Sequence, residues 1–104
     1  MKEIPITITH KVDDGFPPMV AAVLADANGK RHQFVEKDVV VTSTGITTYS
    51  IFPMLGIIPC QVESEWIDAE GRLLVRATTA QPWGVESTAG CTTFVALVTQ
   101  LRDA

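Results

Sequence analysis

Residues 4–12 alternate between apolar and polar side chains. Isoleucines at alternate positions, followed by His10, occupy one face of this segment, and threonines with a proline occupy the other. A period of two residues is typical of a β-strand with one buried face. Pro5 has no backbone N–H to donate to a ladder, so we expect this strand to lie at a sheet edge or to begin at one.

Two short sequences of the same form predict tight turns between paired strands. Asp26-Ala27-Asn28-Gly29 and Asp68-Ala69-Glu70-Gly71 each place an aspartate first and a glycine fourth, as in a type I turn closed by a left-handed glycine. Such turns join the strands of hairpins. The first hairpin is therefore expected to pair residues 19–26 with 30–36, and the second to pair 60–68 with 72–79. The alanine-rich residues 19–27 also fit a short helix, but the turn that follows them favours a strand.

The rest of the chain shows signals of further strands. Residues 39–41 are three consecutive valines, which favour an extended piece. A turn is expected at 88–90, followed by a returning strand over 91–99 and a frayed tail or short turn over 100–104. No linker divides the chain, so residues 1–104 are expected to form one domain. Turn signals every ~8–12 residues predict an all-β fold, a small antiparallel barrel or sandwich of about six or seven strands.

The composition agrees with this fold class and narrows the range of partners. Valine, isoleucine and threonine make up almost a third of the chain, and such β-branched side chains pack well on sheet faces. The net charge of −4 leaves no basic surface for a nucleic-acid backbone. No apolar run approaches the ~18 residues of a membrane span, and no signal peptide is evident. We therefore expect a cytoplasmic protein with no nucleic-acid or membrane partner, in which free thiols are favoured over a disulfide for Cys60 and Cys91.

Candidate groups for acid–base chemistry are few. Glu63 and Glu65 are two positions apart on a predicted strand, so both carboxylates point to one face about 7 Å apart, a separation that glycosidases use. The simpler interpretation is a solvated strand face, because nothing nearby would desolvate them. His10 is either a base at the rim of the core or, more simply, a neutral imidazole that caps the core edge. His32 follows a turn and is expected to be exposed.

Motifs that would indicate other chemistry do not occur. The spacing of His and Cys fits no metal site, the serines lack a nucleophile elbow, and the glycines form no phosphate-binding loop. We therefore expect no metal, no cofactor and no catalytic residue.

Large apolar side chains gather in two constrained segments. Trp83 lies between a proline and a glycine, and Tyr49, Phe52 and Met54 lie in a segment divided by chain-breaking residues. Exposed together, these side chains would form an apolar patch of the kind that binds partner proteins. A domain this small also needs its large residues in the core, so the alternative is that Trp83 covers the core and residues 49–55 plug one end of a barrel.

The segment Pro82-Trp83-Gly84-Val85-Glu86-Ser87 follows a hairpin with an Asp-Ala-x-Gly turn and precedes Gly90, Thr93 and Phe94. In this arrangement residues 62–101 loosely resemble small uncharacterised bacterial all-β proteins. The resemblance implies a bacterial source and an all-β fold. It brings no activity with it, so it assigns no functional residue.

A small β domain without a reactive constellation acts through its surface. The sequence therefore favours a non-catalytic binding or assembly domain, which binds a protein partner or a second copy of the chain through its apolar and aromatic surface. The alternative is a small hydrolase-like enzyme that uses Glu63 or Glu65, or a small-ligand carrier.

Overall fold

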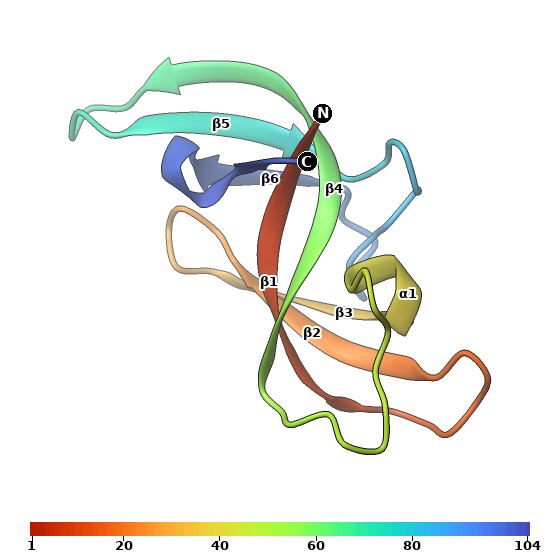
Figure 1. Ribbon diagram of the computed structural model, residues 1–104. Helices are drawn as coiled ribbons and strands as arrows, with labels where there is room; N and C mark the ends of the chain where they lie inside the picture. Colours follow the sequence, from red (N-terminus) through yellow and green to blue (C-terminus); the bar gives the residue numbers. More distant parts are fainter.

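The computed structural model describes all 104 residues and shows a curled antiparallel sheet with one short helix (Figure 1). Seven strands and an α-helix of only 4 residues confirm the expected all-β fold, and residues 19–25 form a strand as the turn predicted. In chain order the elements are β1 (Lys2–Lys11), β2 (Met19–Ala25), β3 (Arg31–Lys37), α1 (Asp38–Val41), β4 (Met54–Ile67), β5 (Leu73–Thr78), β6 (Thr93–Leu97), the 3₁₀ turn η1 (Val98–Gln100) and β7 (Arg102–Asp103).

The strands follow the order β3-β2-β1-β4-β5-β6 across the sheet, and β7 pairs with the beginning of β1. β4 is the longest strand, with 14 residues, and it holds the two halves of the sheet together. Its first half pairs with β1, from Ile8↔Met54 to Lys2↔Cys60, and its second half pairs only with β5. Because strands twist, this long strand turns the sheet back on itself and brings the β2–β3 hairpin towards β6 (Figure 1).

Contacts between the first and last parts of the chain partly close the curled sheet. The N–H of Ala27, in the turn after β2, donates to the carbonyl oxygen of Val95 in β6 at 2.9 Å. The ring of Phe94 packs edge-on against His32, with centroids 4.8 Å apart, and lies 5.7 Å from the ring of Phe34. The core that these contacts enclose consists of Ile4, Ile6, Ile8, Val20, Ala22, Leu24, Phe34, Val41, Ile58, Cys60, Val75, Ala77, Val85, Phe94 and Ala96.

Both predicted turns are confirmed, and they have the same geometry. In each, the aspartate carboxylate accepts hydrogen bonds from the N–H groups two and four residues later, at 2.9–3.0 Å. Gly29 and Gly71 both have a φ of 79°, in the left-handed region. The Arg72 guanidinium donates to the carbonyl of Ala27 and to the side-chain oxygen of Asn28, so the two turns lie side by side.

The expectation of an extended piece at 39–41 is wrong, because these valines form α1. Valine favours strands, but packing overrides that preference here. Val41 is fully buried in the core, and the side chain of Asp38 accepts a hydrogen bond from the N–H of Ile46 at 2.9 Å. Gly56 of β4 makes room for the helix, since a Cβ at that position would lie 2.7 Å from the carbonyl oxygen of Val41.

Pro5 does not place β1 at the sheet edge. β1 is a central strand, with β4 on one side and β2 and β7 on the other. β7 pairs with Lys2 and Glu3, and β2 pairs from Thr7 onward, so Pro5 lies in the gap between these two ladders. A missing N–H there interrupts no pairing on that side. The pairing of β7 also shows that residues 102–103 are not a frayed tail, whereas Gln100 does end a short turn, η1.

Both histidines differ from expectation. A β-bulge between Ile8 and His10 interrupts the alternation of β1, and His10 is exposed instead of capping the core edge. The His32 side chain, expected to be exposed, has only 12% of its surface accessible. Its Nε2 donates to Asp26 Oδ2 at 2.9 Å, and its ring lies against Phe94.

Candidate functional site

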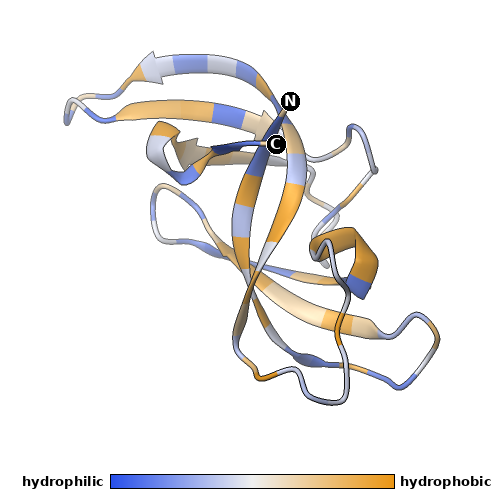
Figure 2. Ribbon diagram, viewed as in Figure 1, coloured by the Kyte–Doolittle hydropathy of each residue, from blue (hydrophilic) through white to orange (hydrophobic).

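Three hollows on the surface of the protein all border α1 and residues 42–48, which follow it. α1 is apolar apart from its first residue (Figure 2) and contacts both β3 and β4. Four large apolar side chains that line these hollows are exposed to solvent: Phe16, Val39, Leu55 and Trp83.

The first of these hollows, the Trp83 groove, has a volume of about 360 Å³. Trp83 is 67% exposed and Val39 is 63% exposed, so both present apolar surface to solvent. Ile57 and Pro59 are two positions apart on β4 and therefore point to the same face of the sheet. The groove is lined by Val39, Val40, Thr42, Ser43, Ile57, Pro59 and Trp83.

A short loop holds Trp83 outside the core. Thr79, at the base of this loop, is buried; its N–H donates to Thr92 O at 2.8 Å and its hydroxyl donates to Val85 O at 2.6 Å. The N–H of Val85 returns a hydrogen bond to Thr79 O at 2.9 Å. The side chain that enters the core from this loop is that of Val85, and residues 81–84, which include Trp83, are exposed.

The other residues of the predicted apolar surface lie in different environments. Tyr49 is 90% exposed in the segment after α1 and lines none of the hollows. Phe52 and Met54 are half-buried and pack against the core. Met54 and Leu55 line a small hollow that shares Ile57 with the Trp83 groove, so the groove continues as an apolar strip along β4. This strip connects Trp83 with Met54 and Leu55, and it does not reach Tyr49 or Phe52.

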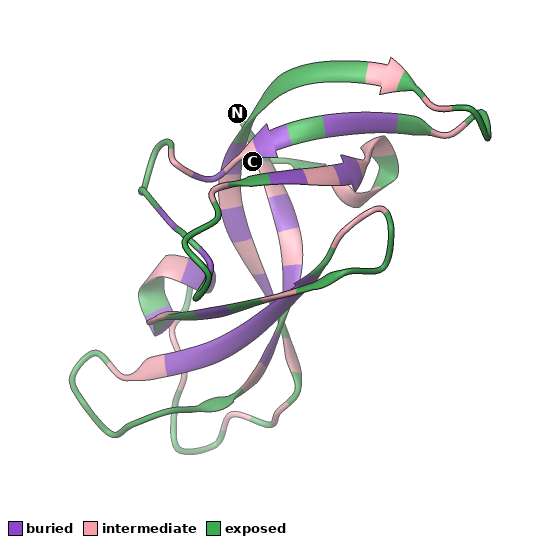
Figure 3. Ribbon diagram, turned by 180° about the vertical axis from the view of Figure 1, so that it is seen from behind, coloured by how far each residue is buried: buried purple, intermediate pink, exposed green.

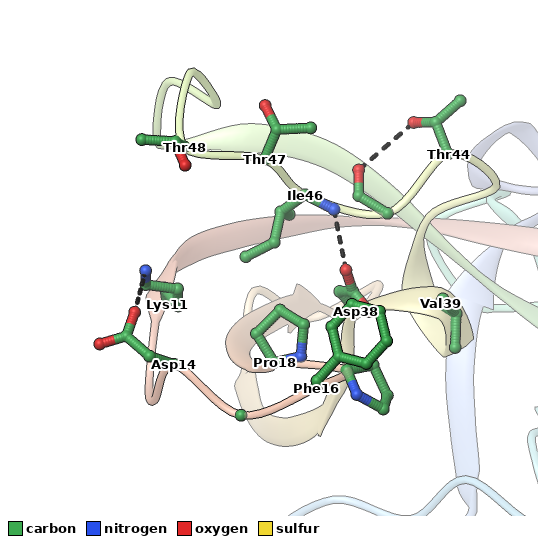
Figure 4. Close-up of a pocket in the computed structure, with 13 residues that line it drawn as sticks. Lys11, Asp14, Phe16, Pro18, Asp38, Val39, Thr44, Ile46, Thr47 and Thr48 are labelled. Atoms are coloured by element: carbon green, nitrogen blue, oxygen red, sulfur yellow. Dashed lines mark hydrogen bonds and ion pairs between the residues drawn. The ribbon is translucent and has the colours of Figure 1, made fainter.

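The remaining hollow, the Asp38 cleft, opens on the other side of Val39. It has a volume of about 390 Å³ and lies between the β1–β2 loop and residues 44–48 (Figure 4). The Asp38 side chain stands between these two walls; its Oδ2 accepts the Ile46 N–H, and its Oδ1 has no hydrogen-bond partner in the protein. Phe16, at the rim, is fully exposed.

Carboxylates outnumber cationic groups around the Asp38 cleft. Lys11 forms an ion pair with Asp14 at the rim, so these two charges balance. Asp13 belongs to the same β1–β2 loop but does not line the cleft; hydrogen bonds from the N–H groups of Met19 and Gly15 hold its pKa below the ordinary value. Asp38 belongs to none of the ion pairs of the chain. The cleft is therefore a site of net negative charge.

The structure does not bring His10 near Glu63 and Glu65. Glu63 and Glu65 are exposed on the second half of β4, where only β5 accompanies the strand (Figure 3). His10 lies towards the opposite end of the β1–β4 pair. Extending the register beyond its last pairs puts His10 roughly eleven strand positions from Glu63, a path along the strands on the order of 35 Å.

Sequence reasoning missed Asp38, Phe16 and Val39. Phe16 carries a usable signal, because an aromatic residue between a glycine and two prolines is constrained in the same way as Trp83. Asp38 carries none, since its burial depends on Ile46 and on a carbonyl of the β1–β2 loop that only the fold brings near.

The chain contains no group of three or more His, Cys, Asp or Glu side chains placed to hold a metal ion. None of its helices has the length and hydropathy needed to cross a bilayer. Both cysteines are free, Cys60 buried and Cys91 exposed.

Compared with protein-family models, with curated proteins and with solved structures, the chain matches none of them. Its function is therefore inferred from the site itself.

Proposed function

We propose that this protein is a non-catalytic binding domain that docks on a partner protein through the Trp83 groove. The observation that carries this proposal is the exposure of Trp83, at 67%, as one wall of an apolar groove. Tryptophan side chains dominate the binding energy of many protein interfaces when a partner covers them. An exposed tryptophan beside exposed Val39 and the β4 strip supplies such an anchor.

The loop that carries Trp83 favours binding because it is already ordered. Thr79 and Val85 close its base with backbone and hydroxyl hydrogen bonds, and both residues are buried. Ordering a loop at an interface costs binding free energy, so a loop that is fixed beforehand retains more of the energy gained by covering Trp83.

The occupant that fits this groove is an apolar side chain of an extended segment in a partner protein. The groove and its continuation along β4 form an elongated strip lined mainly by aliphatic groups, with Thr42, Ser43 and Thr44 as its polar members. The net charge of −4 argues against a nucleic-acid partner. We also propose that the protein is bacterial, as the resemblance of the Pro82–Ser87 segment suggests. A cytoplasmic location is part of the same proposal, and the two free thiols favour it.

The hydrolase alternative finds less support. Glu63 and Glu65 are exposed neighbours on the second half of β4, His10 is exposed at the far end of β1, and none of the three borders a hollow in which a substrate would be held.

A peptide display selection tests the proposal. Twelve-residue peptides selected on the wild-type chain should bind at least ~10-fold more weakly to Trp83→Ala, since an anchor of this kind contributes 1.4 kcal/mol or more. Tyr49→Ala is the matched control, because it removes an even more exposed aromatic ring outside the groove and should change affinity by less than ~3-fold. Both variants should unfold within about 0.5 kcal/mol of wild type.

Two results separate the alternatives. If Trp83→Ala loses about 2 kcal/mol of stability while peptide affinity is unchanged, Trp83 is a structural residue and the proposal fails. If the wild-type chain dimerises in sedimentation equilibrium and Trp83→Ala is monomeric, the occupant of the groove is a second copy of the chain.

A further inference from the structure

A buried carboxyl group of this chain has one oxygen that no protein donor satisfies. Asp38 is 4% exposed, and it is held in place from three directions. Its N–H donates to Pro18 O at 2.9 Å, its carbonyl accepts the Thr42 N–H at 2.9 Å, and its Oδ2 accepts the Ile46 N–H at 2.9 Å. Oδ1 has no partner. A buried acceptor left without a donor costs about 1–3 kcal/mol, and more when it is charged.

No cation of the chain compensates Asp38. Lys11, the lysine that lines the Asp38 cleft, is engaged with Asp14 at the rim. The ordinary solution for a buried carboxylate is a cation with N–H donors in hydrogen-bond contact. No donor of the chain reaches Oδ1, so a cationic donor from outside the chain would complete this arrangement.

The walls of the cleft fit an organic cation better than a metal ion. A divalent metal needs several oxygen ligands, and no cluster of carboxylates or imidazoles surrounds Asp38. The cleft instead offers one carboxyl group, the fully exposed ring of Phe16, and the apolar surfaces of Pro17, Pro18 and Val39. An aromatic face beside a carboxylate attracts a planar guanidinium through cation–π contact and charge-assisted hydrogen bonds. The apolar walls accommodate an alkyl stem.

Both walls of the cleft are loops, which permits a ligand to reach the oxygen. Oδ1 is screened from solvent, so the walls must part before a donor contacts it. Residues 44–48 are held mainly by local hydrogen bonds to Thr42 and Ser50, and the bond from Ile46 to Asp38 is their tie across the cleft. A shift of this segment therefore breaks few hydrogen bonds, and the contact of the Ile46 side chain with the core is the main packing that it disturbs.

We infer that the Asp38 cleft binds an alkylguanidinium group, with Asp38 as the counter-ion and Phe16 stacked on the cation. This site shares only the Val39 wall with the Trp83 groove, and the inference does not depend on the function proposed for that groove. The guanidinium belongs either to a small free ligand or to an arginine side chain of another protein.

The test is a titration followed by backbone-amide NMR, with three probes. Butylguanidinium represents a free ligand, a blocked Gly-Arg-Gly peptide represents a protein side chain, and a blocked Gly-citrulline-Gly peptide is the neutral isostere. We expect saturable shifts confined to residues 14–18, 38–39 and 44–48, with a dissociation constant on the order of 1 mM for the cations. The citrulline peptide should bind at least ~10-fold more weakly than the arginine peptide.

Comparison of the two cations identifies the source. Equal affinity for butylguanidinium and for the arginine peptide supports a free ligand, and tighter binding of the peptide supports a side chain of a partner protein. Equal affinity for arginine and citrulline peptides overturns the inference, as does an absence of saturation at ~50 mM of either cation.

Three variants test the roles of the residues. Asp38→Asn retains an acceptor for the Ile46 N–H and should keep the fold, but it should weaken butylguanidinium binding at least ~10-fold. Asp14→Asn removes the same charge from the rim and should weaken binding less than ~3-fold. Phe16→Ala should weaken binding about two- to fivefold. Because Phe16 is fully exposed, this variant should fold, and it replaces Asp38→Asn as the test if Asp38→Asn does not fold. Unchanged binding in Asp38→Asn, or in Phe16→Ala where only that variant folds, overturns the inference.

Discussion

The close approach of α1 to β4 gives the sharpest stability prediction. A Cβ at Gly56 would lie 2.7 Å from the carbonyl oxygen of Val41 and 2.8 Å from Cδ1 of Ile8. Ordinary contacts of this kind are above 3.4 Å, so the neighbours would have to move by more than half an ångström. Val41 O is backbone, and Ile8 is fully buried, so neither retreats easily. We expect Gly56→Ala to destabilise the protein by about 2–3 kcal/mol, as overpacking in a dense core does.

The sign of this effect is informative because alanine is otherwise the better residue in a strand. Where no clash exists, Gly→Ala inside a strand stabilises by about 0.5–1 kcal/mol. Urea unfolding followed by circular dichroism measures the difference, and the melting temperature should fall by about 10–20 °C. A Gly56→Ala variant at least as stable as wild type would show that α1 does not pack against β4 in this way.

Three further predictions concern the turns, pH and the thiols. Gly71→Val should lower the free energy of unfolding by about 1–2 kcal/mol, because valine resists the φ of 79° at this position; no atom lies within 4 Å of the added Cβ, so a clash plays no part. An unchanged melting temperature contradicts the turn geometry. Burial raises the pKa of Asp26, but hydrogen bonds from His32, Asn28 and Lys30 outweigh it and hold that pKa below its ordinary value. The ionised Asp26 carboxylate therefore stabilises the fold at pH values above its unfolded pKa of ~3.9, and this stabilisation is lost as the pH falls. The free energy of unfolding, measured between about pH 5 and 2, should depend less on pH in Asp26→Asn than in wild type. An equal dependence in both proteins refutes this role of Asp26. In the native protein a thiol reagent should label Cys91 quickly and Cys60 only on unfolding, because Cys60 is fully buried and burial raises the pKa of its thiol. In Cys91→Ser the thiol that remains is Cys60, so fast labelling of this variant contradicts the prediction.

The parts of the fold that follow from local chemistry are the parts that the sequence predicts. Asp26 and Asp68 accept hydrogen bonds from their own turns, so the residues that determine each turn lie within five positions of one another. The hairpins, and with them the all-β class, follow from these turns and from the β-branched side chains.

The features that sequence reasoning misplaced depend on contacts between distant segments. Residues 39–41 are helical because Asp38 meets Ile46 and because Gly56, which lies fifteen positions beyond Val41, leaves space for the helix. The environment of His10 depends on a β-bulge whose position the alternation of β1 does not reveal. His32 is covered by Phe94, which comes from the other end of the chain. No local pattern encodes these contacts.

The Trp83 groove and the Asp38 cleft share Val39 as a common wall, so one extended segment could occupy both. A helix with its side chains is about 10–12 Å across, and a strand rises ~3.3 Å per residue. A segment crossing α1 would thus carry its apolar anchor and its arginine three or four positions apart. For peptides with this spacing, both Trp83→Ala and Asp38→Asn should weaken binding, because the second contact forms at high effective concentration. Peptides with the arginine adjacent to the anchor should respond to Trp83→Ala alone. If both peptide types respond identically to Asp38→Asn, the two hollows do not serve one segment.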